Sequence, residues 1–181
     1  MPSTTQGDAF VTMRDAFVGR LTQSCLGMFD IVTIYIGEQL GLYQALAEKG
    51  AAISAELAGR TATVERYVRE WLEQQAVTGI LEVENPTGDG ASRRYSLPAA
   101  HAEVLLDADS LNFMGPFPQQ MIGTTRPLRA VITAFRDGGG VPYDAYGADC
   151  RDGIAAGNRV AFLNLLGTSW FPAIPGLDAR L

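Results

Sequence analysis

The chain has 181 residues, of which 47% are hydrophobic and 19% are charged, and its formal net charge is −6. This length and composition predict a folded chain with one core of ordinary size, and we expect residues 1–181 to form a single domain. The acidic charge disfavours nonspecific attraction to nucleic acid or to an anionic membrane, because the long-range field has the wrong sign.

The N-terminal stretch, residues 8–41, carries a long apolar stripe in which apolar side chains recur every three or four residues, as is typical of a helix. Glycine costs roughly 1 kcal/mol inside a helix, so Gly27 and Gly37 are expected to divide it into two helices, Asp8 to about Leu26 and Met28 to about Leu40. Few monomers need so long a stripe, and the sequence therefore predicts a homodimer held by these N-terminal helices. The interface candidates are Phe17, Leu21, Met28, Phe29 and Val32.

The cysteines and the most apolar run predict the cellular compartment of the protein. Cys25 to Ile36 is shorter than the ~20 residues that cross a bilayer, so no membrane partner is expected. Cys25 and Cys150 lie far apart, outside any C-x-x-C spacing, and no signal peptide is recognised before them. We therefore expect a reduced, cytoplasmic protein with two packed thiols.

Residues 42–98 have the order of elements of a winged helix: helix, helix, helix, strand, wing, strand. Ser54 is expected to cap the second helix with its side-chain oxygen. Turn-forming residues between the two strands predict the wing. The expected segments are Leu42 to Ala47, Ala55 to Gly59, Thr63 to Thr78, Ile80 to Glu84, Pro86 to Gly90 and Arg93 to Leu97.

The third of these helices has one apolar and one polar face. The apolar face is expected to hold Val64, Tyr67, Val68, Trp71, Leu72 and Ala76. The outward residues are expected to be Glu65, Arg66, Arg69, Glu70, Glu73, Gln74 and Gln75, with three acids against two bases. A helix that reads a DNA groove must approach a dense row of phosphates, and residues 42–98 hold eight acids and six bases. DNA is therefore an unlikely partner.

Residues 99–171 are expected to be largely helical, with prolines separating the segments and a last helix from Asp152 to about Trp170. His101 has no triad or metal set near it in sequence, so we assign no catalytic and no metal-binding residue. Asp137 to Gly140 is interpreted as a hinge, because a phosphate-binding loop follows a strand and this run follows a helical stretch.

Tyr143 and Tyr146 flank Asp144 in the loop after this hinge. Two interpretations are open: the rings pack under the loop, or they line a small-molecule pocket, since loops hold a large share of binding residues. With Trp170, they are the candidates for a substrate pocket.

Four segments resemble the N-terminal module of a bacterial family of class I S-adenosylmethionine-dependent methyltransferases, whose members are often labelled transcriptional regulators. They are Gly37 to Ala47, Ala55 to Ala58, Glu65 to Gln75 and Gly79 to Leu81, and Arg66 to Leu72 is the most specific part. The resemblance runs over essentially the whole chain. It implies a winged-helix module that dimerises, with residues 99–171 as a lid over the substrate, followed by a doubly wound α/β domain that transfers the methyl group.

The sequence departs from that family in one respect. The cofactor site needs a strand leading into an acidic-x-Gly-x-Gly-x-Gly loop and a further acid for the ribose, and these 181 residues contain no such loop. Residues 172–181 are interpreted as the linker before the methyl-transfer domain, so the chain is expected to be an excised module or a product that kept only this part. No cofactor-binding residue is assigned, and S-adenosylmethionine is expected only in the presumed full-length protein.

Three functions therefore stay open. The leading one is the dimerisation and substrate-recognition module of a small-molecule methyltransferase, not catalytic alone, which meets its small-molecule substrate through the full-length protein. The second is a winged-helix DNA-binding regulator, and the third is a cofactor-independent protein that binds a small ligand through Tyr143 and Tyr146.

Overall fold

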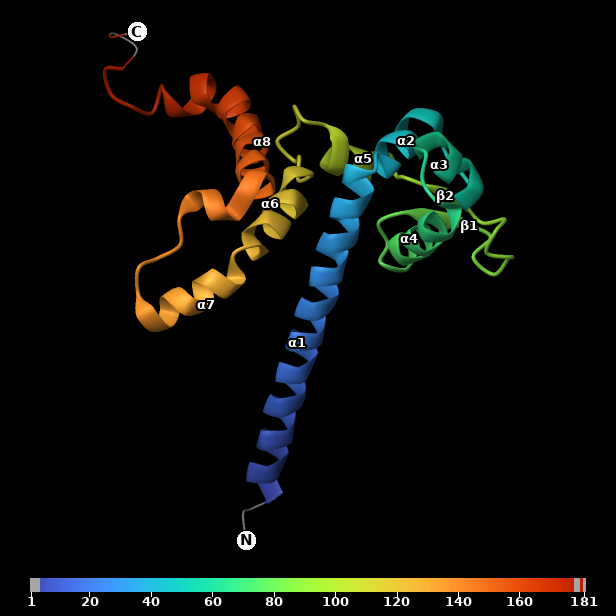
Figure 1. The fold of residues 1–181 in the computed structure, drawn as a ribbon, viewed down its shortest axis with the longest axis horizontal. Coiled ribbons are helices and arrows are strands. Elements are labelled where there is room, and N and C mark those ends of the chain that lie inside the picture. The colour runs from blue at the N-terminus through green and yellow to red at the C-terminus, as the bar shows by residue number, and fades with distance from the viewer. Residues whose placement is uncertain (1–3, 178–179, 181) are drawn as a thin grey trace.

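The computed structural model describes residues 4–177 and Arg180. The fold is mainly helical, as the sequence predicts: a long helix carries a winged-helix unit at its C-terminal end, and further helices lie beside it (Figure 1). In chain order the elements are α1 Thr4–Gln39, α2 Leu42–Lys49, α3 Ser54–Thr61, α4 Glu65–Val77, β1 Glu82–Glu84, β2 Arg94–Ser96, α5 Ala99–Leu106, α6 Pro116–Thr125, α7 Leu128–Asp137, the 3-10 helix η1 Tyr143–Tyr146, α8 Gly147–Leu165 and the π-helix η2 Leu166–Trp170.

The N-terminal stretch is one helix, so the expected division into two helices is wrong. At Gly27 nothing lies within 4 Å of where a Cβ would be, and its cost of roughly 1 kcal/mol is small against a helix that continues on both sides. Gly37 has a different use. A Cβ there would collide with the ring of Trp71 and lie 2.7 Å from Cε2 of Tyr43, so the glycine lets α4 and α2 pack closely on α1.

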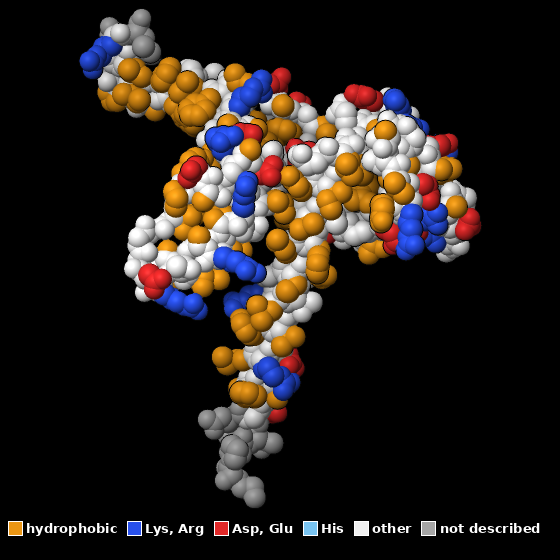
Figure 2. Space-filling view, viewed as in Figure 1, with side chains coloured by type: hydrophobic (Ala, Val, Ile, Leu, Met, Phe, Trp, Pro, Cys, Tyr) orange, Lys and Arg blue, Asp and Glu red, His pale blue; other side chains and the backbone are white. Residues whose placement is uncertain are grey.

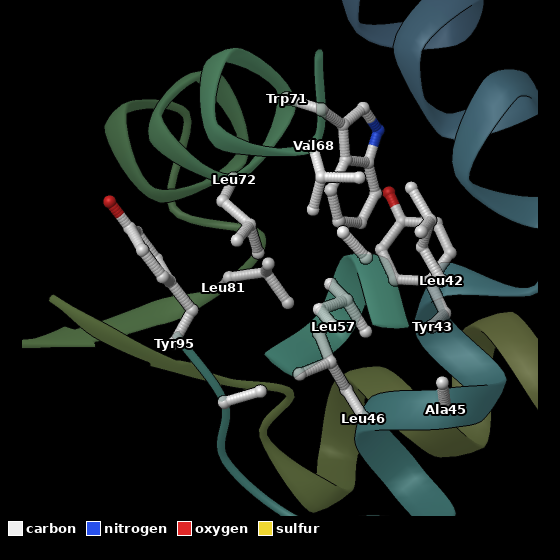
Figure 3. Packing of buried hydrophobic residues seen from close by; sticks show 12 residues of the cluster. Leu42, Tyr43, Ala45, Leu46, Leu57, Val68, Trp71, Leu72, Leu81 and Tyr95 are labelled. Carbon is white, nitrogen blue, oxygen red and sulfur yellow. The ribbon is translucent and has the colours of Figure 1, made fainter. Parts of the chain in front are cut away.

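The winged-helix unit has its own apolar core, which α2, α3 and α4 surround and the wing closes (Figure 3). Gly41, with φ of 66°, makes the turn between α1 and α2, a conformation that glycine adopts without strain. The rings of Tyr43 and Trp71 meet edge to face with centroids 5.0 Å apart. The buried members of the core are Leu42, Tyr43, Ala45, Leu46, Ala52, Leu57, Ala58, Val68, Trp71, Leu72, Leu81 and Tyr95.

The faces of α4 differ from the expected ones at three positions. Val64 and Tyr67 are exposed, whereas Gln75, expected to point outward, is fully buried. The reason is that α4 packs against α1 as well as against the winged core, which turns its buried face toward Trp71 and Gln75, and a buried glutamine is tolerated because α1 and α2 supply hydrogen-bond partners.

The start of α3 also differs from expectation, because Ser54 is its first residue and does not cap it. Its hydroxyl instead donates to Oε1 of Glu65 at 2.5 Å, tying α3 to α4. The Glu56 carboxylate accepts the backbone N–H of Ile53 at 3.2 Å and so takes over part of the role expected of Ser54.

The wing is an antiparallel pair in which Val83 lies opposite Tyr95. Its two strands are shorter than expected but occupy the expected places. Ala52, between α2 and α3, bridges to Tyr95 through two backbone hydrogen bonds of 2.9 and 3.0 Å, which fixes the wing to the helical part of the unit.

The C-terminal helices centre on a close crossing of α6 and α8. A Cβ at Gly123 would collide with the backbone of Cys150, and one at Gly153 would lie 2.7 Å from the backbone nitrogen of Gln120, so a glycine on each helix permits the approach. The last helix begins at Gly147, not at Asp152 as expected, because Gly147 with φ of 76° turns the chain from η1 directly into α8. After Leu165 the helix α8 continues as the π-helix η2, which ends at Trp170.

Residues 172–177, in the expected linker, form turns and bends. Residues 178, 179 and 181 of that linker lie outside the described residues.

Cys150 is buried but Cys25 is exposed, so only one of the two thiols is packed within the chain. No single described helix is long and apolar enough to span a membrane, although the bent pair Gly7–Gln39 and Leu42–Lys49 together has the length and composition.

Candidate functional site

The first candidate surface is the free length of α1. Every residue from Gly7 to Phe29 is exposed, and Figure 2 shows apolar side chains along this part of the helix. Four of the five interface candidates, Phe17, Leu21, Met28 and Phe29, are exposed, and Val32 is half-buried. The structure thus brings the candidates onto one helix, and no described part of the chain buries the four exposed ones. We call residues 7–29 the free segment of α1.

The rest of α1 is held by hydrogen bonds that begin at Asp30. Its carboxylate accepts the Gln74 side-chain amide at 3.0 Å, and the carbonyl oxygen of Thr33 accepts the indole N–H of Trp71 at 2.8 Å. The Gln75 amide donates to the Thr33 hydroxyl at 3.1 Å and accepts the hydroxyl of Tyr43. These bonds fix the direction in which the free segment leaves the winged-helix unit.

These hydrogen bonds of Asp30 and Thr33 to Trp71, Gln74 and Gln75, which we call the anchor of α1, are not predicted by any sequence pattern. Trp71 and Gln75 are four residues apart and therefore share a face of α4, which is the one signal that could have indicated a buried glutamine. Their partner Thr33 lies about forty residues earlier in the chain, and no spacing pattern connects the two segments.

A half-buried carboxyl group lies close to this anchor. Burial raises the pKa of the Glu38 carboxyl to about 7, and its Oε2 has no hydrogen-bond partner among the described residues. Burial also raises the pKa of the Tyr43 phenol, with smaller contributions from the charges of Glu38 and Asp30. Glu38 can therefore change its charge near neutral pH at the point where α1 meets the winged-helix unit.

The second candidate surface is the outer face of α4 and the wing, where a DNA-binding winged helix would meet phosphates. Its arginines are already engaged by acids. Arg69 pairs with Glu65 at 2.7 Å, and the wing arginines Arg93 and Arg94 pair with acids at 3.2 and 3.0 Å. Within the part of α4 and the wing that the structure describes, Arg66 alone among the bases makes no ion pair. This face therefore presents little uncompensated positive charge.

The third candidate is the pair of tyrosines in η1. The rings of Tyr143 and Tyr146 lie side by side with centroids 6.4 Å apart, and Tyr143 is exposed. Tyr146 borders an open hollow of about 390 Å³ between α7 and the hinge. Its other lining residues are Val131, Ala134, Phe135, Gly140 and Val141.

Trp170 is not part of this group. It lies at the opposite end of α8, a helix of 19 residues and so ~28 Å long, where its ring packs edge to face on Phe162 with centroids 5.5 Å apart. The structure therefore brings two of the three pocket candidates together and leaves the third elsewhere.

His101 has a local structural contact. The His101 ring nitrogen Nδ1 lies 2.8 Å from the carbonyl oxygen of Ile80, which holds α5 against the turn after α4. Gly138, Gly139 and Gly140 all have positive φ and follow the helix α7, so the strand that precedes a phosphate-binding loop is absent before this run, and the hinge stays a prediction. In the described ranges no three His, Cys, Asp or Glu side chains lie close enough to hold a metal ion.

Comparison with known proteins identifies the fold. Residues 29–106 match the profile described as the Rv2258c-like winged HTH domain, in agreement with the winged-helix fold of this part of the chain. Eleven chains of solved structures match, and one is the structure of the Mitomycin 7-O-methyltransferase MmcR. That match has a TM-score of 0.60 and 17% sequence identity, and it covers 84% of this chain and 46% of the other. No curated protein matches the chain in sequence.

These matches confirm the resemblance drawn from the sequence at the level of the fold. The chain spans less than half the length of the methyltransferase structure and corresponds to its N-terminal part. The profile begins at Phe29, so residues 7–28 of the free segment lie outside the winged domain that it describes.

Proposed function

We propose that the chain is the dimerisation and substrate-recognition module of an S-adenosylmethionine-dependent small-molecule methyltransferase and is not catalytic alone. The observation that carries the proposal is the free segment of α1, an apolar helix that leaves a winged-helix unit whose own core is already complete. The structural match over 84% of the chain to part of an O-methyltransferase supports it.

The free segment supports dimerisation on energetic grounds. Burying a large apolar side chain contributes roughly 1.5–3 kcal/mol. The five candidates Phe17, Leu21, Met28, Phe29 and Val32 together thus offset much of the ~4–15 kcal/mol cost of association. A two-fold pairing covers the stripes of both copies at once, which explains why one chain leaves its stripe bare.

The methyltransferase assignment rests on the partial match and on the sequence. S-adenosylmethionine would be held by a second, α/β domain, since a glycine-rich cofactor loop does not occur in these 181 residues. In this proposal α6 to α8, with Tyr143 and Tyr146, form the side of the substrate pocket that the module contributes. The protein would act in the cytoplasm, without a membrane partner.

Light scattering of the chain at micromolar concentration tests the assembly. We expect a mass of twice 19.4 kDa, and Phe17→Asp should give monomer or aggregate because a carboxylate would be buried in the seam. Gln23→Asp, on the opposite, polar side of the free segment, is the matched control and should remain dimeric. A mass near 19.4 kDa for the unsubstituted chain would refute the interface.

The coding sequence downstream of Leu181 tests the methyltransferase assignment separately. We expect it to open a doubly wound α/β domain with a glycine-rich loop after its first strand. A stop codon there, together with a stable dimer, would retain the assembly and contradict the enzymatic part.

The fold itself favours one alternative, a winged-helix DNA-binding regulator. The ion pairs of Arg69, Arg93 and Arg94 with neighbouring acids oppose it, because arginines already engaged are less available to phosphates. A cofactor-independent ligand-binding protein remains the third possibility, and the open hollow beside Tyr146 is the observation that favours it.

A further inference from the structure

A hollow of about 250 Å³ lies where α5 passes the C-terminal half of α1 and the turn that follows α4 (Figure 1). Its aliphatic walls are half-buried, so the hollow is open at the surface. An apolar cavity of about 150 Å³ is enough to hold benzene, so this hollow has room for one ring with a small substituent. The lining residues are Ile34, Gly79, Ile80, His101, Val104 and Leu105.

The helix α5 turns one face toward the hollow. His101, Val104 and Leu105 are three and four residues apart in this helix and therefore share a face. Ile34 and Ile80 come from other elements and, like Leu105, pack against the buried core of the winged-helix unit. The walls of the hollow are therefore held in place by the folded unit.

The ring of His101 is the polar side chain among these lining residues, and its tautomer is fixed by one hydrogen bond. Its Nδ1 lies 2.8 Å from the carbonyl oxygen of Ile80. A carbonyl oxygen can only accept a hydrogen bond, so Nδ1 carries the proton and donates it. In the neutral ring the other nitrogen, Nε2, then has a free lone pair and can only accept.

The Nε2 atom is available to a ligand. It has no hydrogen-bond partner among the described residues, and it is not one of the partnerless polar atoms that are closed to solvent. No charged side chain lines the hollow, so a charged ligand would lose its hydration there without gaining a partner of opposite charge. The hollow therefore combines apolar walls with one hydrogen-bond acceptor.

We propose that this hollow binds a small neutral molecule with an apolar body of about one ring and an O–H or N–H group, which donates a hydrogen bond to Nε2 of His101. The apolar body would lie against the aliphatic side chains that line the hollow. An ether or a ketone of the same size is disfavoured, because it has no proton to donate to Nε2. The inference goes beyond the proposed function and depends neither on the free segment of α1 nor on Tyr143 and Tyr146.

The chain has a single histidine, so labelling with nitrogen-15 histidine makes its two ring nitrogens visible without overlap. In spectra of the full chain at about pH 8, where histidine rings are ordinarily neutral, we expect a protonated Nδ1 and an unprotonated Nε2. Addition of 4-methylphenol should shift the Nε2 resonance toward that of a hydrogen-bonded nitrogen. A protonated Nε2 in the free chain, or no Nε2 shift up to ~10 mM 4-methylphenol, would overturn the proposal.

Two further probes separate the hydrogen bond from the apolar contact. 4-Methylanisole and toluene have the ring but no O–H or N–H group. Both should bind about five-fold or more weakly than 4-methylphenol and leave the Nε2 resonance nearly unchanged. Equal affinities for the three probes would contradict a hydrogen bond to His101.

His101→Asn separates binding from the structural contact of the ring. The asparagine amide can keep a donor near the position of Nδ1, facing the carbonyl oxygen of Ile80, but it has no counterpart of Nε2. The variant should bind 4-methylphenol about five-fold more weakly and toluene as before, as amide shifts in α5 would measure. An unchanged affinity for 4-methylphenol in the folded variant would show that His101 only tethers α5.

A filling substitution keeps the proposal testable if His101→Asn fails to fold. Val104 is half-buried and lines the hollow from α5, so Val104→Phe should occupy the space of the ligand body and abolish the Nε2 shift. Ala99→Phe, at an exposed alanine that borders a different hollow on the other side of α5, is the matched control and should retain the shift. A retained shift in folded Val104→Phe would place 4-methylphenol elsewhere and contradict the site.

Discussion

The winged-helix unit and the helices on either side of it use apolar side chains in opposite ways. The unit buries twelve of them in one cluster, six of which, such as Leu72, are no more than 1% exposed. In α7, by contrast, Phe135 is 89% exposed, and the free segment of α1 is bare along its length. The unit is therefore complete within one chain, whereas the flanking helices have apolar faces that a second chain or a further domain would cover.

The largest expected effect tests this difference directly. Leu72→Ala removes a fully buried side chain from the winged core and should lower the free energy of unfolding by about 2–5 kcal/mol. Leu163→Ala, at an exposed leucine of α8, is the matched substitution and should change it by less than ~0.5 kcal/mol. Urea unfolding followed by circular dichroism measures both. Equal losses would show that α8 has a core of its own and that the two regions do not differ.

A pair of glycines in α1 provides the next test. Gly37→Ala would force a methyl group against Trp71 and Tyr43 and should cost about 1–3 kcal/mol. Gly27→Ala meets nothing within 4 Å and should stabilise the helix by up to ~1 kcal/mol. Thermal unfolding of the two variants should therefore shift in opposite directions. If both gained stability, α1 would not be packed on the winged unit as closely as described.

The same two glycines show what the sequence could and could not predict. The winged unit was predictable because each of its elements has a local signal: a 3.6-residue period in α4, alternation in the strands, and turn residues between them. Gly37 carried the same local signal as Gly27, a residue that weakens helices. Only the position of Trp71, more than thirty residues later, gives it the role of a close contact.

The anchor and the pocket candidates also depend on contacts between distant segments, which local sequence patterns do not predict. The burial of Gln75 depends on Thr33 and Tyr43, which come from other helices, so the polar character of the side chain predicted the wrong face. Tyr143 and Tyr146 are predictable as neighbours because they are close in sequence. No pattern in the sequence indicates that the length of α8 keeps Trp170 apart from them.

The junction between the two regions should respond to pH through Glu38. Its carboxyl pKa is about 7 in the folded chain and near 4.5 when exposed, so the folded state holds a proton that the unfolded state releases between those values. The free energy of unfolding should therefore fall as pH rises from about 4.5 to about 7 and then level off. We expect a loss of about 1–2 kcal/mol, because part of the side chain still faces water.

Glu38→Gln isolates this effect. The variant should lose the decline between pH 4.5 and 7 and be more stable than the unsubstituted chain at pH 8, as urea unfolding at several pH values would show. Glu84→Gln, at an exposed glutamate of β1, should keep the decline. An unchanged decline in Glu38→Gln would assign the pH dependence to other groups.

The smallest effect on stability comes from the ion pairs of the winged unit, yet they decide what its outer face can bind. Replacing Glu56, Glu65 and Glu73 by glutamine removes the partners of Arg94, Arg69 and Arg93. Exposed ion pairs contribute little to the free energy of unfolding, so the protein should stay folded. The released arginines should then bind duplex DNA at low salt, with the slope of log affinity against log salt steeper by up to about 0.9 per added phosphate contact.

Gel-shift titration separates this charge effect from the fold. The unsubstituted chain should give no sequence-selective shift at physiological salt and submicromolar protein. A control with Asp8, Asp137 and Asp144 changed to asparagine alters the net charge by the same three units, from −6 to −3, without releasing the winged-unit arginines, and should bind less DNA than the glutamine variant. If the two variants bound equally, net charge alone would govern the interaction. A selective shift by the unsubstituted chain would instead show that the winged unit reads DNA despite its ion pairs, and the regulator would replace the methyltransferase module as the leading function.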